Sequence, residues 1–320
     1  MPFVTGAILP GGVHVEEDAE FLYICVITRV DVHRLCFPHP SQMMGQSSVF
    51  CEVNLNSFHR NNLHMRSQKI EGLSYTAGSW ATASVGCTAL SNGVFRSFSL
   101  SGGIFVFDDL RNVSMIGALW RNITARAESR IDAVSSFVDR VGGVDEAYFV
   151  TFDTDYMLKF WCVSTRSCVF ARQVDCGGAP AGPIAPGDSQ CKLVSLCWPK
   201  EGQNSKIAVL LSGHNPGNPV VQLFTGTSSN YNISISDEPK TIQPPAGSPQ
   251  VSMTGTSDES VICAWDDGSI TKHDLFGENQ VFSCLSFAFS LFSNTKPPLR
   301  SRRFASSLHL TSMPCTWRRI

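Results

Sequence analysis

Two histidines and a cysteine lie close together near the start of the chain, in a set that could bind a metal ion. His33, Cys36 and His39 are spaced three residues apart. Imidazole and thiolate groups are the usual ligands of zinc, but this spacing matches no established zinc motif and a further ligand is not evident. His33 and Cys36 fall within a predicted strand, and His39 within a Pro-His-Pro turn. We therefore expect these residues to pack in the fold, and we predict no metal site.

Two carboxylates could form a second kind of site. Asp153 and Asp155 could act as a general acid and a general base. They stand between two apolar runs, 148–152 and 157–163. An aspartate between two strands normally accepts hydrogen bonds from its own backbone. We therefore expect a turn at this place, and we predict no catalytic residue.

Two tryptophans and a glycine pair could form a ligand site. Trp161 and Trp265 could line a pocket, and Gly102-Gly103 could hold an anion against the backbone. Large aromatic residues in β-strands more often pack against neighbouring sheets. No helix pattern follows the glycines, so a hairpin turn is the simpler interpretation. We predict no cofactor site from these residues.

The chain contains none of the common catalytic motifs. There is no G-x-S-x-G elbow, H-E-x-x-H pair, glycine-rich phosphate loop or G-x-G-x-x-G fingerprint. We therefore predict that the protein is not an enzyme and that it has no cofactor and no small-molecule substrate.

The composition is that of a globular protein with an acidic body. Hydrophobic residues make up 43% and charged residues 16% of the 320 residues, so disorder is not the default. Six of the 25 basic residues follow the last acidic residue, Glu278, which leaves 19 basic and 27 acidic residues before Asn279, a net charge of about −8. An acidic body argues against binding of nucleic acid. Residues 283–320 lack acids and periodicity, so we expect a disordered basic tail.

The cysteines and the apolar runs indicate a reducing, non-membrane setting. No C-x-x-C pair occurs among the 12 cysteines, and several stand in apolar runs where a free thiol behaves as a small hydrophobe. The N-terminus lacks the basic start and the apolar run of a signal peptide. No apolar stretch is long enough to span a bilayer. We expect reduced thiols in the cytosol or nucleus and no transmembrane segment.

The stretch 149–170 predicts the architecture that positions these residues. It contains three short apolar runs separated by an Asp/Thr turn and a Ser/Thr/Arg turn, with a tryptophan in the middle run. This order of strand, turn, strand, turn and strand is typical of a WD-type propeller blade. We therefore predict an all-β fold, an incomplete β-propeller over residues 1–282 followed by the tail 283–320.

The remaining pattern predicts more strand pairs, with long loops and an insertion between them. The strand pairs recur at intervals compatible with about 40 to 50 residues per blade, which leaves room for six or seven blades at most. Helical spacing of apolar residues at 112–141 favours one or two short inserted helices. Predicted strands are 3–9 (closed by a turn at Pro10-Gly11-Gly12), 21–30, 32–37, 94–98, 104–107, 148–152, 157–163, 168–170, 193–198, 206–211, 220–224, 261–265 and 269–275, and predicted loops are 41–76, 176–188 and 239–249.

Several of these segments resemble one known family, in the same order along the chain. The matching residues are Pro10, Gly11 and Gly12 in L-P-G-G, His33, Arg34 and Leu35 in V-H-R-L, Pro38, His39 and Pro40 in P-H-P-S, Gly102, Gly103 and Phe105 in S-G-G-I-F-V, Leu158 and Trp161 in L-K-F-W, and Trp265 in A-W. Together they resemble the large nucleoporin family of the Y-shaped scaffold complex. The resemblance spans most of residues 8–275.

The resemblance implies a structural role rather than a catalytic one. Members of that family have an N-terminal seven-bladed propeller followed by a long helical domain, and they belong to the outer ring of the nuclear pore. The expected partners are other nucleoporins of the Y-shaped complex, and the expected location is the nuclear pore complex at the nuclear envelope, in support of transport that includes mRNA export. The chain begins at an interior strand of that propeller, so we expect an unclosed ring. A stand-alone WD-type interaction module without a pore role is one alternative, and a propeller that binds a small ligand in its central channel is the other.

Overall fold

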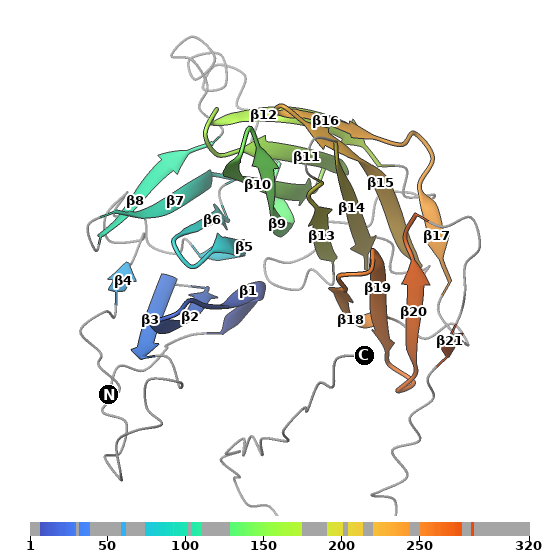
Figure 1. The fold of residues 1–320 in the computed structure, drawn as a ribbon, viewed down its shortest axis with the longest axis horizontal. Helices are drawn as coiled ribbons and strands as arrows, with labels where there is room; N and C mark the ends of the chain where they lie inside the picture. Colours follow the sequence, from blue (N-terminus) through green and yellow to red (C-terminus); the bar gives the residue numbers. More distant parts are fainter. Residues whose placement is uncertain are drawn as a thin grey trace, which may run out of the picture. The chain divides into compact units, whose positions relative to one another are not determined.

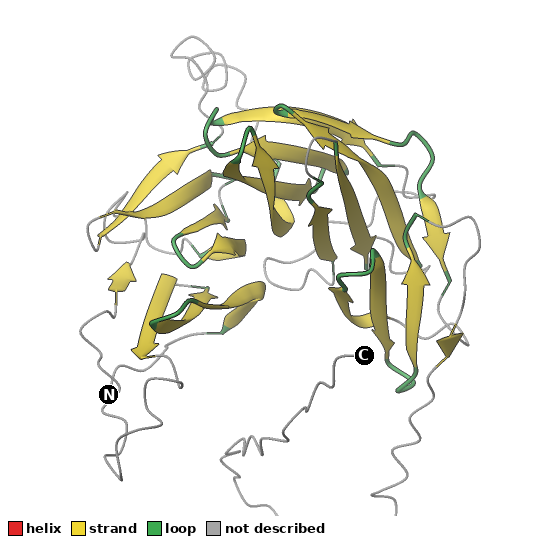
Figure 2. Ribbon diagram, viewed as in Figure 1, coloured by secondary structure: helices red, strands yellow, loops and turns green. Residues whose placement is uncertain are grey.

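The computed structural model describes twelve segments of the chain. They are residues 7–29, 32–38, 59–61, 74–91, 93–101, 104–110, 129–174, 191–200, 204–213, 220–243, 250–276 and 283–284. The chain divides into two compact units, 1–286 and 287–320, and all described residues belong to the first. Every regular element among them is a β-strand (Figure 2).

Five antiparallel sheets follow one another in the described part of the chain, and each forms one blade of a β-propeller (Figure 1). Within a blade the strands lie in chain order, so the first strand is the inner edge of its sheet. These inner strands are β1, β5, β9, β13 and β18, and each contacts the next one. The predicted all-β propeller is thus confirmed. Five blades lie within the predicted limit of six or seven.

The first blade contains the hairpin predicted at residues 21–37. Its strands are β1 (Ile8–Glu17), β2 (Phe21–Thr28), β3 (Val32–Pro38) and β4 (His59–Asn61). Because β4 lies inside the predicted loop 41–76, that prediction is wrong at these residues. The strand is only three residues long and carries no apolar alternation, so no pattern marked it.

The turn predicted at Pro10-Gly11-Gly12 is instead a bulge inside β1. The register with β2 shifts between Ile8 and Val13, and the strand continues to Glu17. Gly11 has φ +72°, and a Cβ on Gly12 would lie 2.7 Å from the carbonyl oxygen of Ile27. Glycine therefore serves a close backbone approach here. The glycines correctly indicated an unusual backbone, but the prediction that the chain reverses direction here is wrong.

The second blade has the glycine hairpin predicted from the sequence. Its strands are β5 (Tyr75–Thr82), β6 (Val85–Leu90), β7 (Phe95–Ser101) and β8 (Ile104–Asp109). Ser101 pairs with Ile104, which leaves two positions between the paired strands; Gly102 and Gly103 themselves lie outside the described residues. Only glycine, asparagine and aspartate fit such turns readily.

The third blade replaces part of the predicted helical insertion. Its strands are β9 (Ile131–Val141), β10 (Val144–Asp153), β11 (Met157–Cys162) and β12 (Ser167–Gln173). The helix prediction is therefore wrong for 131–141, and residues 112–128 lie outside the described part. Strand β9 is buried on both faces: Ala133 and Phe137 join one core cluster, Ile131 and Val134 another. Burial on both faces hides the two-residue period of a strand.

The fourth and fifth blades contain the remaining strands. They are β13 (Lys192–Trp198), β14 (Ser205–Ser212), β15 (Val221–Ser229), β16 (Asn232–Ile235) and β17 (Lys240–Ile242), then β18 (Gln250–Gly255), β19 (Ser260–Trp265), β20 (Ile270–Asp274) and β21 (Ser283–Cys284). Strand β17 pairs with β15 inside the predicted loop 239–249, so that loop prediction is wrong at these residues. The predicted loop 176–188 lies outside the described residues.

The hydrophobic core lies between blades rather than within one. The largest cluster joins the third and fourth blades through residues such as Phe160 and Phe224. A second cluster joins the second and third blades and includes Phe95, Phe149 and Trp161. Because a single sheet cannot bury its own faces, each blade depends on its neighbours for burial of its apolar side chains.

Candidate functional site

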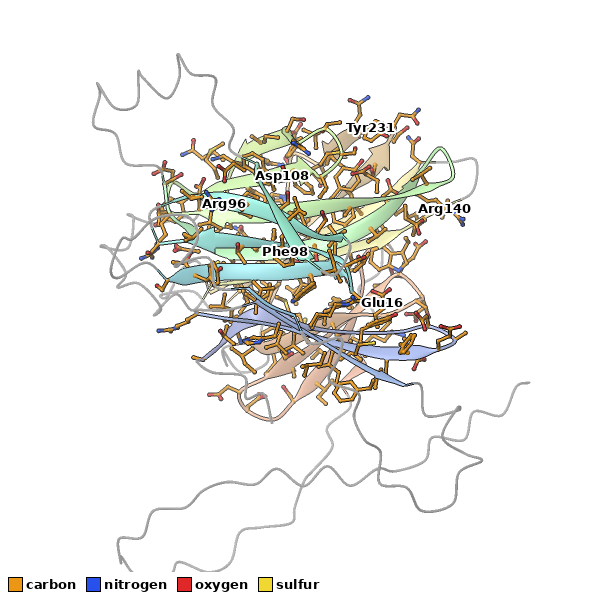
Figure 3. The ribbon with its side chains drawn as sticks, turned by 90° about the vertical axis from the view of Figure 1, so that its left-hand side faces the viewer. Glu16, Arg96, Phe98, Asp108, Arg140 and Tyr231 are labelled. Atoms are coloured by element: carbon orange, nitrogen blue, oxygen red, sulfur yellow. The ribbon has the colours of Figure 1, made fainter. Side chains whose placement is uncertain are left out.

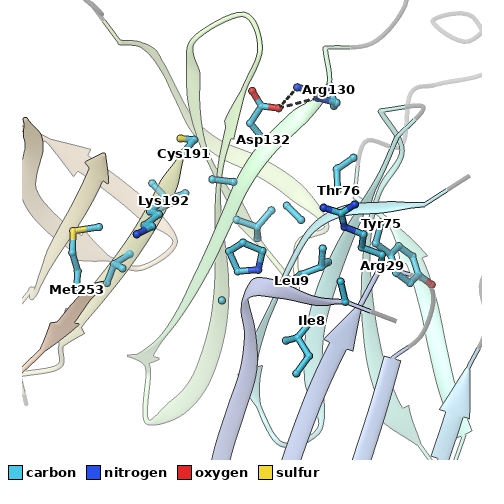
Figure 4. Close-up of a pocket in the computed structure, with 18 of the residues that line it drawn as sticks. Ile8, Leu9, Arg29, Tyr75, Thr76, Arg130, Asp132, Cys191, Lys192 and Met253 are labelled. Atoms are coloured by element: carbon cyan, nitrogen blue, oxygen red, sulfur yellow. Dashed lines mark hydrogen bonds and ion pairs between the residues drawn. The ribbon is translucent and has the colours of Figure 1, made fainter. Parts of the chain in front are cut away.

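The inner strands of all five blades surround one cavity of about 560 Å³ (Figure 4). This volume is within the usual range of ligand sites. Residues from the first half of each inner strand and just before it supply most of the lining. They are 7–11, Arg29, 75–77, Arg130, 132–134, 191–194, Ser252 and Met253.

The charged groups of the cavity are mostly basic. Arg29, Arg130 and Lys192 line it together with one carboxylate, Asp132. Arg130 donates hydrogen bonds to Oδ1 of Asp132 from Nε at 2.9 Å and Nη2 at 2.8 Å. Burial raises the pKa of Asp132, and the Arg130 guanidinium opposes that rise. Burial lowers the pKa of Lys192. We call Arg29, Arg130 and Lys192 together the basic mouth.

The basic mouth and one acidic turn lie at opposite ends of the inner strands. In an up-and-down blade the first-to-second and third-to-fourth turns share one end, and the inner strand begins at the other. The acidic turn between β1 and β2 contains Glu17, Asp18 and Glu20. Figure 3 shows Glu16 and Arg140, which precede the β1–β2 and β9–β10 turns, toward the same side. The basic mouth and the β1–β2 turn thus lie at opposite ends of the inner strands.

Serine hydroxyls connect the inner strands of three blades. Ser136 donates to the carbonyl oxygen of Trp80 at 2.6 Å and lies 2.9 Å from the hydroxyl of Ser79, both in β5. Its neighbour Ser135 accepts hydrogen bonds from the N–H and the hydroxyl of Ser195 in β13, at 2.8 and 2.9 Å. Because successive residues of a strand point to opposite faces, β9 bonds to both neighbouring blades at once.

Other polar contacts connect the first and fifth blades to the rest. Glu16 in β1 accepts a hydrogen bond from the N–H of Ala83 at 2.5 Å, in the turn between β5 and β6. Trp198 donates from Nε1 to the carbonyl oxygen of Thr256 at 3.0 Å. The Nζ of Lys206 lies 2.5 Å from Glu259 Oε2. Each neighbouring pair of blades is thus joined by polar bonds as well as by apolar packing.

The residues selected by the family motifs lie in several places. Pro10 and Gly11 line the cavity, and Gly12 lies in the adjacent bulge. His33 is fully buried, Arg34 stacks over the ring of Tyr23 at 4.3 Å, and Leu35 is half-buried. The side chains of Pro38 and Phe105 and all of His39, Pro40, Gly102 and Gly103 lie outside the described residues.

The motif residues Leu158, Trp161 and Trp265 lie away from the cavity. Leu158 is fully buried, and Trp161 lies in the cluster between the second and third blades, 5.5 Å from the Phe95 ring. Each tryptophan donates from Nε1 to a threonine hydroxyl, Trp161 to Thr151 at 2.9 Å and Trp265 to Thr271 at 2.8 Å. Neither tryptophan lines the cavity. Each indole group is thus hydrogen-bonded within its own blade and packs against the neighbouring blade.

Neither His33 with Cys36 nor Asp153 with Asp155 forms a reactive site among the described residues. His33 and Cys36 are three positions apart on β3 and so point to opposite faces. No group of three His, Cys, Asp or Glu side chains among the described residues could hold a metal ion. Asp153 accepts hydrogen bonds from the N–H groups of Asp155 and Met157, which matches the predicted turn. Its Oδ2 also lies 2.7 Å from the Nζ of Lys159.

The cysteines that the structure describes are all free thiols. Eight have a described side chain, and four of these, Cys87, Cys162, Cys25 and Cys263, are fully buried. Burial raises the pKa of the Cys25 and Cys263 thiols to about 12. These thiols stay protonated near neutral pH and pack as small hydrophobes.

Sequence reasoning missed the residues that give the cavity its character. Arg29, Arg130 and Lys192 belong to no motif and are far apart in the chain, and only the ring of inner strands brings them together. The serine pair had a weak signal. Two adjacent hydroxyls at Ser135 and Ser136 interrupt an apolar run, which suggests polar contacts on both faces of one strand.

Comparison with known proteins decides the family. The model of the nucleoporin Nup120/160 β-propeller domain matches residues 4–290. The chain belongs to this family. The matches with two curated relatives, both called nuclear pore complex protein Nup160, cover 53% of the chain: one from Mus musculus is 33% identical over 196 residues, and one from Homo sapiens is 26% identical over 194 residues. They span 14% and 13% of those relatives.

Solved propellers are also similar to this Nup120/160 propeller, but at a distance. The Myceliophteria_thermophila Cps50 (Swd1) β-propeller domain has a TM-score of 0.43 at 9% identity and is covered over 88% of its chain, with 89% of this chain matched. Chaetomium thermophilum Raptor has a TM-score of 0.44 at 9% identity, over 87% of this chain and 20% of its own. At such scores neither likeness supports a functional conclusion. The described part of the chain contains no helix able to cross a membrane.

Proposed function

We propose that this nucleoporin propeller is a structural, non-catalytic component of the outer ring of the nuclear pore. The observation that carries the proposal is the family match over residues 4–290. The partners are other nucleoporins of the Y-shaped complex, and the location is the nuclear envelope. In that setting the propeller supports nucleocytoplasmic transport, including export of mRNA, through protein contacts alone.

The character of the blades supports a role in protein contact. Buried side chains and polar bonds in the described blades connect one blade to the next, as a rigid platform requires. The described histidines, cysteines and carboxylates form no metal-binding group, and the Asp153 carboxylate is used in a turn and an ion pair. We also propose that residues 1–282 form the propeller domain and 283–320 a basic tail, of which β21 is described beside β20.

Imaging and co-purification test this function. A fluorescently tagged copy of the full chain, expressed at low level, should enrich at the nuclear rim and co-purify with subunits of the Y-shaped complex. A matched copy with Phe160→Ala, which removes a fully buried ring from the third blade, should lose both properties because the platform is destabilised.

The same experiment separates the alternative. A stand-alone interaction module of the WD type would bind other proteins but would neither enrich at the rim nor co-purify with Y-complex subunits. A diffuse cytoplasmic signal for the unmodified, folded chain would overturn the pore assignment.

A further inference from the structure

We propose that the basic mouth of the central cavity binds a short, extended acidic segment of a partner protein. The segment would have acidic side chains separated by apolar ones. This inference goes beyond the structural role proposed above and does not depend on it.

The number and placement of the charges point to a ligand with several negative groups. Arg29 follows the second strand of the first blade, Arg130 precedes the inner strand of the third, and Lys192 begins the inner strand of the fourth. In Figure 4, Arg29 and Lys192 lie on different sides of the cavity, and Arg130 points to Asp132. Since the cations come from three blades, one small anion is poorly matched to all of them. Carboxylates spaced along a peptide match them better.

The surface between the cations is apolar. It includes Ile8 and Pro10 of β1, Val194 of β13 and Met253 of β18, whose side chains are exposed or half-buried. An inorganic anion would leave this surface uncovered. Apolar side chains that alternate with acidic ones would bury it, which adds a hydrophobic contribution to the charge attraction.

The backbone of the inner strands favours an extended ligand. Strands β1, β5, β9, β13 and β18 are edge strands of their sheets, so one edge of each is not paired within its blade. Edge strands add an extended peptide through main-chain hydrogen bonds. A cavity of about 560 Å³ admits a short stretch of extended chain and excludes a folded domain or a duplex.

Burial of Lys192 supports the choice of an acidic ligand. Its ammonium group lies where burial lowers its pKa. A carboxylate beside it would stabilise the charged form and return the pKa toward its ordinary value. Binding of the segment should therefore take up protons at alkaline pH, which isothermal calorimetry in two buffers of different ionisation enthalpy can detect.

Fluorescence polarisation with the full chain tests the site directly. The probe is a short fluorescein-labelled peptide in which glutamate alternates with leucine, and the reference is the same peptide with glutamine in place of glutamate. We expect the acidic peptide to bind and the neutral one to bind at least about tenfold more weakly. Binding should weaken as salt is raised, because the charges are partly open to solvent.

Charge reversal gives the matched comparison. Lys192→Glu and Arg29→Glu should each weaken binding about tenfold or more. Lys240→Glu changes net charge equally but lies exposed on β17, away from the cavity, and should leave binding unchanged. Lys192→Gln, a milder change, keeps the test valid if Lys192→Glu fails to fold by circular dichroism.

Three results would overturn the inference. They are no binding of the acidic peptide, equal binding of the neutral peptide, and equal binding by the Lys192 variants and the unmodified chain. Competition by inorganic pyrophosphate at concentrations as low as those of unlabelled peptide would also overturn it, since the site would then be a general polyanion site. If the unlabelled peptide competes at lower concentrations than pyrophosphate, the result supports a peptide site.

Discussion

The third and first blades contain the same four-stranded unit but differ in what covers their inner strands. In the third blade, β9 packs on both sides, and the side chains of Ile131 and Phe137 are buried in different clusters. In the first blade, β1 packs against β5 through Leu9, while Ile8, Val13 and Val15 are 53%, 52% and 59% exposed. The difference shows that burial in this fold is decided by the neighbouring blade, not by the sequence of the strand itself.

The largest expected difference between these blades comes from buried aromatic rings. Phe160→Ala removes a fully buried ring that contacts Phe137 and Phe170, so the free energy of unfolding should fall by about 3–5 kcal/mol. Phe21→Ala in the half-buried β2 should cost clearly less. Equilibrium urea unfolding of both variants measures this. Equal losses would contradict the dependence on neighbouring blades.

The next effect comes from the buried carboxylate of the third blade. Asp153→Ala leaves the N–H groups of Asp155 and Met157 without their acceptor and removes the ion pair with Lys159. Because Lys159 is partly exposed, we expect a loss of about 3 kcal/mol in urea unfolding. Asp155→Ala, at an exposed position of the same turn, should change stability by less than about 0.5 kcal/mol. Similar values for the two aspartates would refute the argument.

A smaller effect is expected from the serine contacts between inner strands. Ser135→Ala deprives the N–H and the hydroxyl of Ser195 of an acceptor, which should cost about 1–2 kcal/mol. Ser234→Ala, at an exposed position of β16, should be nearly neutral. Thermal unfolding followed by circular dichroism compares the two. If Ser135→Ala were as neutral as Ser234→Ala, packing alone would connect the third and fourth blades.

The fifth blade offers a test through pH. Burial lowers the pKa of His273, which lies 2.7 Å through Nε2 from the hydroxyl of Thr271. The unfolded chain then takes up a proton on His273 near pH 6.5, and the folded chain does so only at a lower pH, so stability should fall as pH drops below about 6.5. The Tm of His273→Gln should depend less on pH between about 7.5 and 5.5 than that of the unmodified chain. An identical dependence would show that other groups cause it.

The smallest effect is expected on the exposed face of β1. Val13→Thr together with Val15→Thr should change the free energy of unfolding by no more than about 0.5 kcal/mol, because both side chains are half exposed. Urea unfolding gives the value. The same substitutions in a doubly covered strand, such as Val134→Thr in β9, should cost more, and a comparable loss in β1 would show that its outer face is covered in solution.

Much of the fold could be predicted from local signals. The Asp turn before Met157, the tryptophan of β11 and the Asp266-Asp267-Gly268 turn are marked by residues whose own chemistry fixes the backbone, as Gly268 does with φ +81°. The all-β class follows from many such turns. Strands β4 and β17 escaped because they are short, and their pairing is decided by the sheets they join.

The cavity could not be predicted from the sequence in the same way. Arg29, Arg130 and Lys192 are separated by more residues than any motif spans, and nothing in the sequence beside them distinguishes them from ordinary surface cations. They come together only because the inner strands of all the described blades line one cavity. The family motifs marked backbone and packing positions instead, such as the bulge at Gly12 and the buried Leu158.

The adjacent serines of β9 limit how the chain can change. Ser136 bonds to the second blade and Ser135 to the fourth, so insertion of one residue within β9 would exchange the two sides. Each hydroxyl would then face the wrong neighbour, and the apolar side chains would be exchanged with them. Insertions and deletions should therefore accumulate in the connections between blades, while the inner strands keep their residue spacing across related chains.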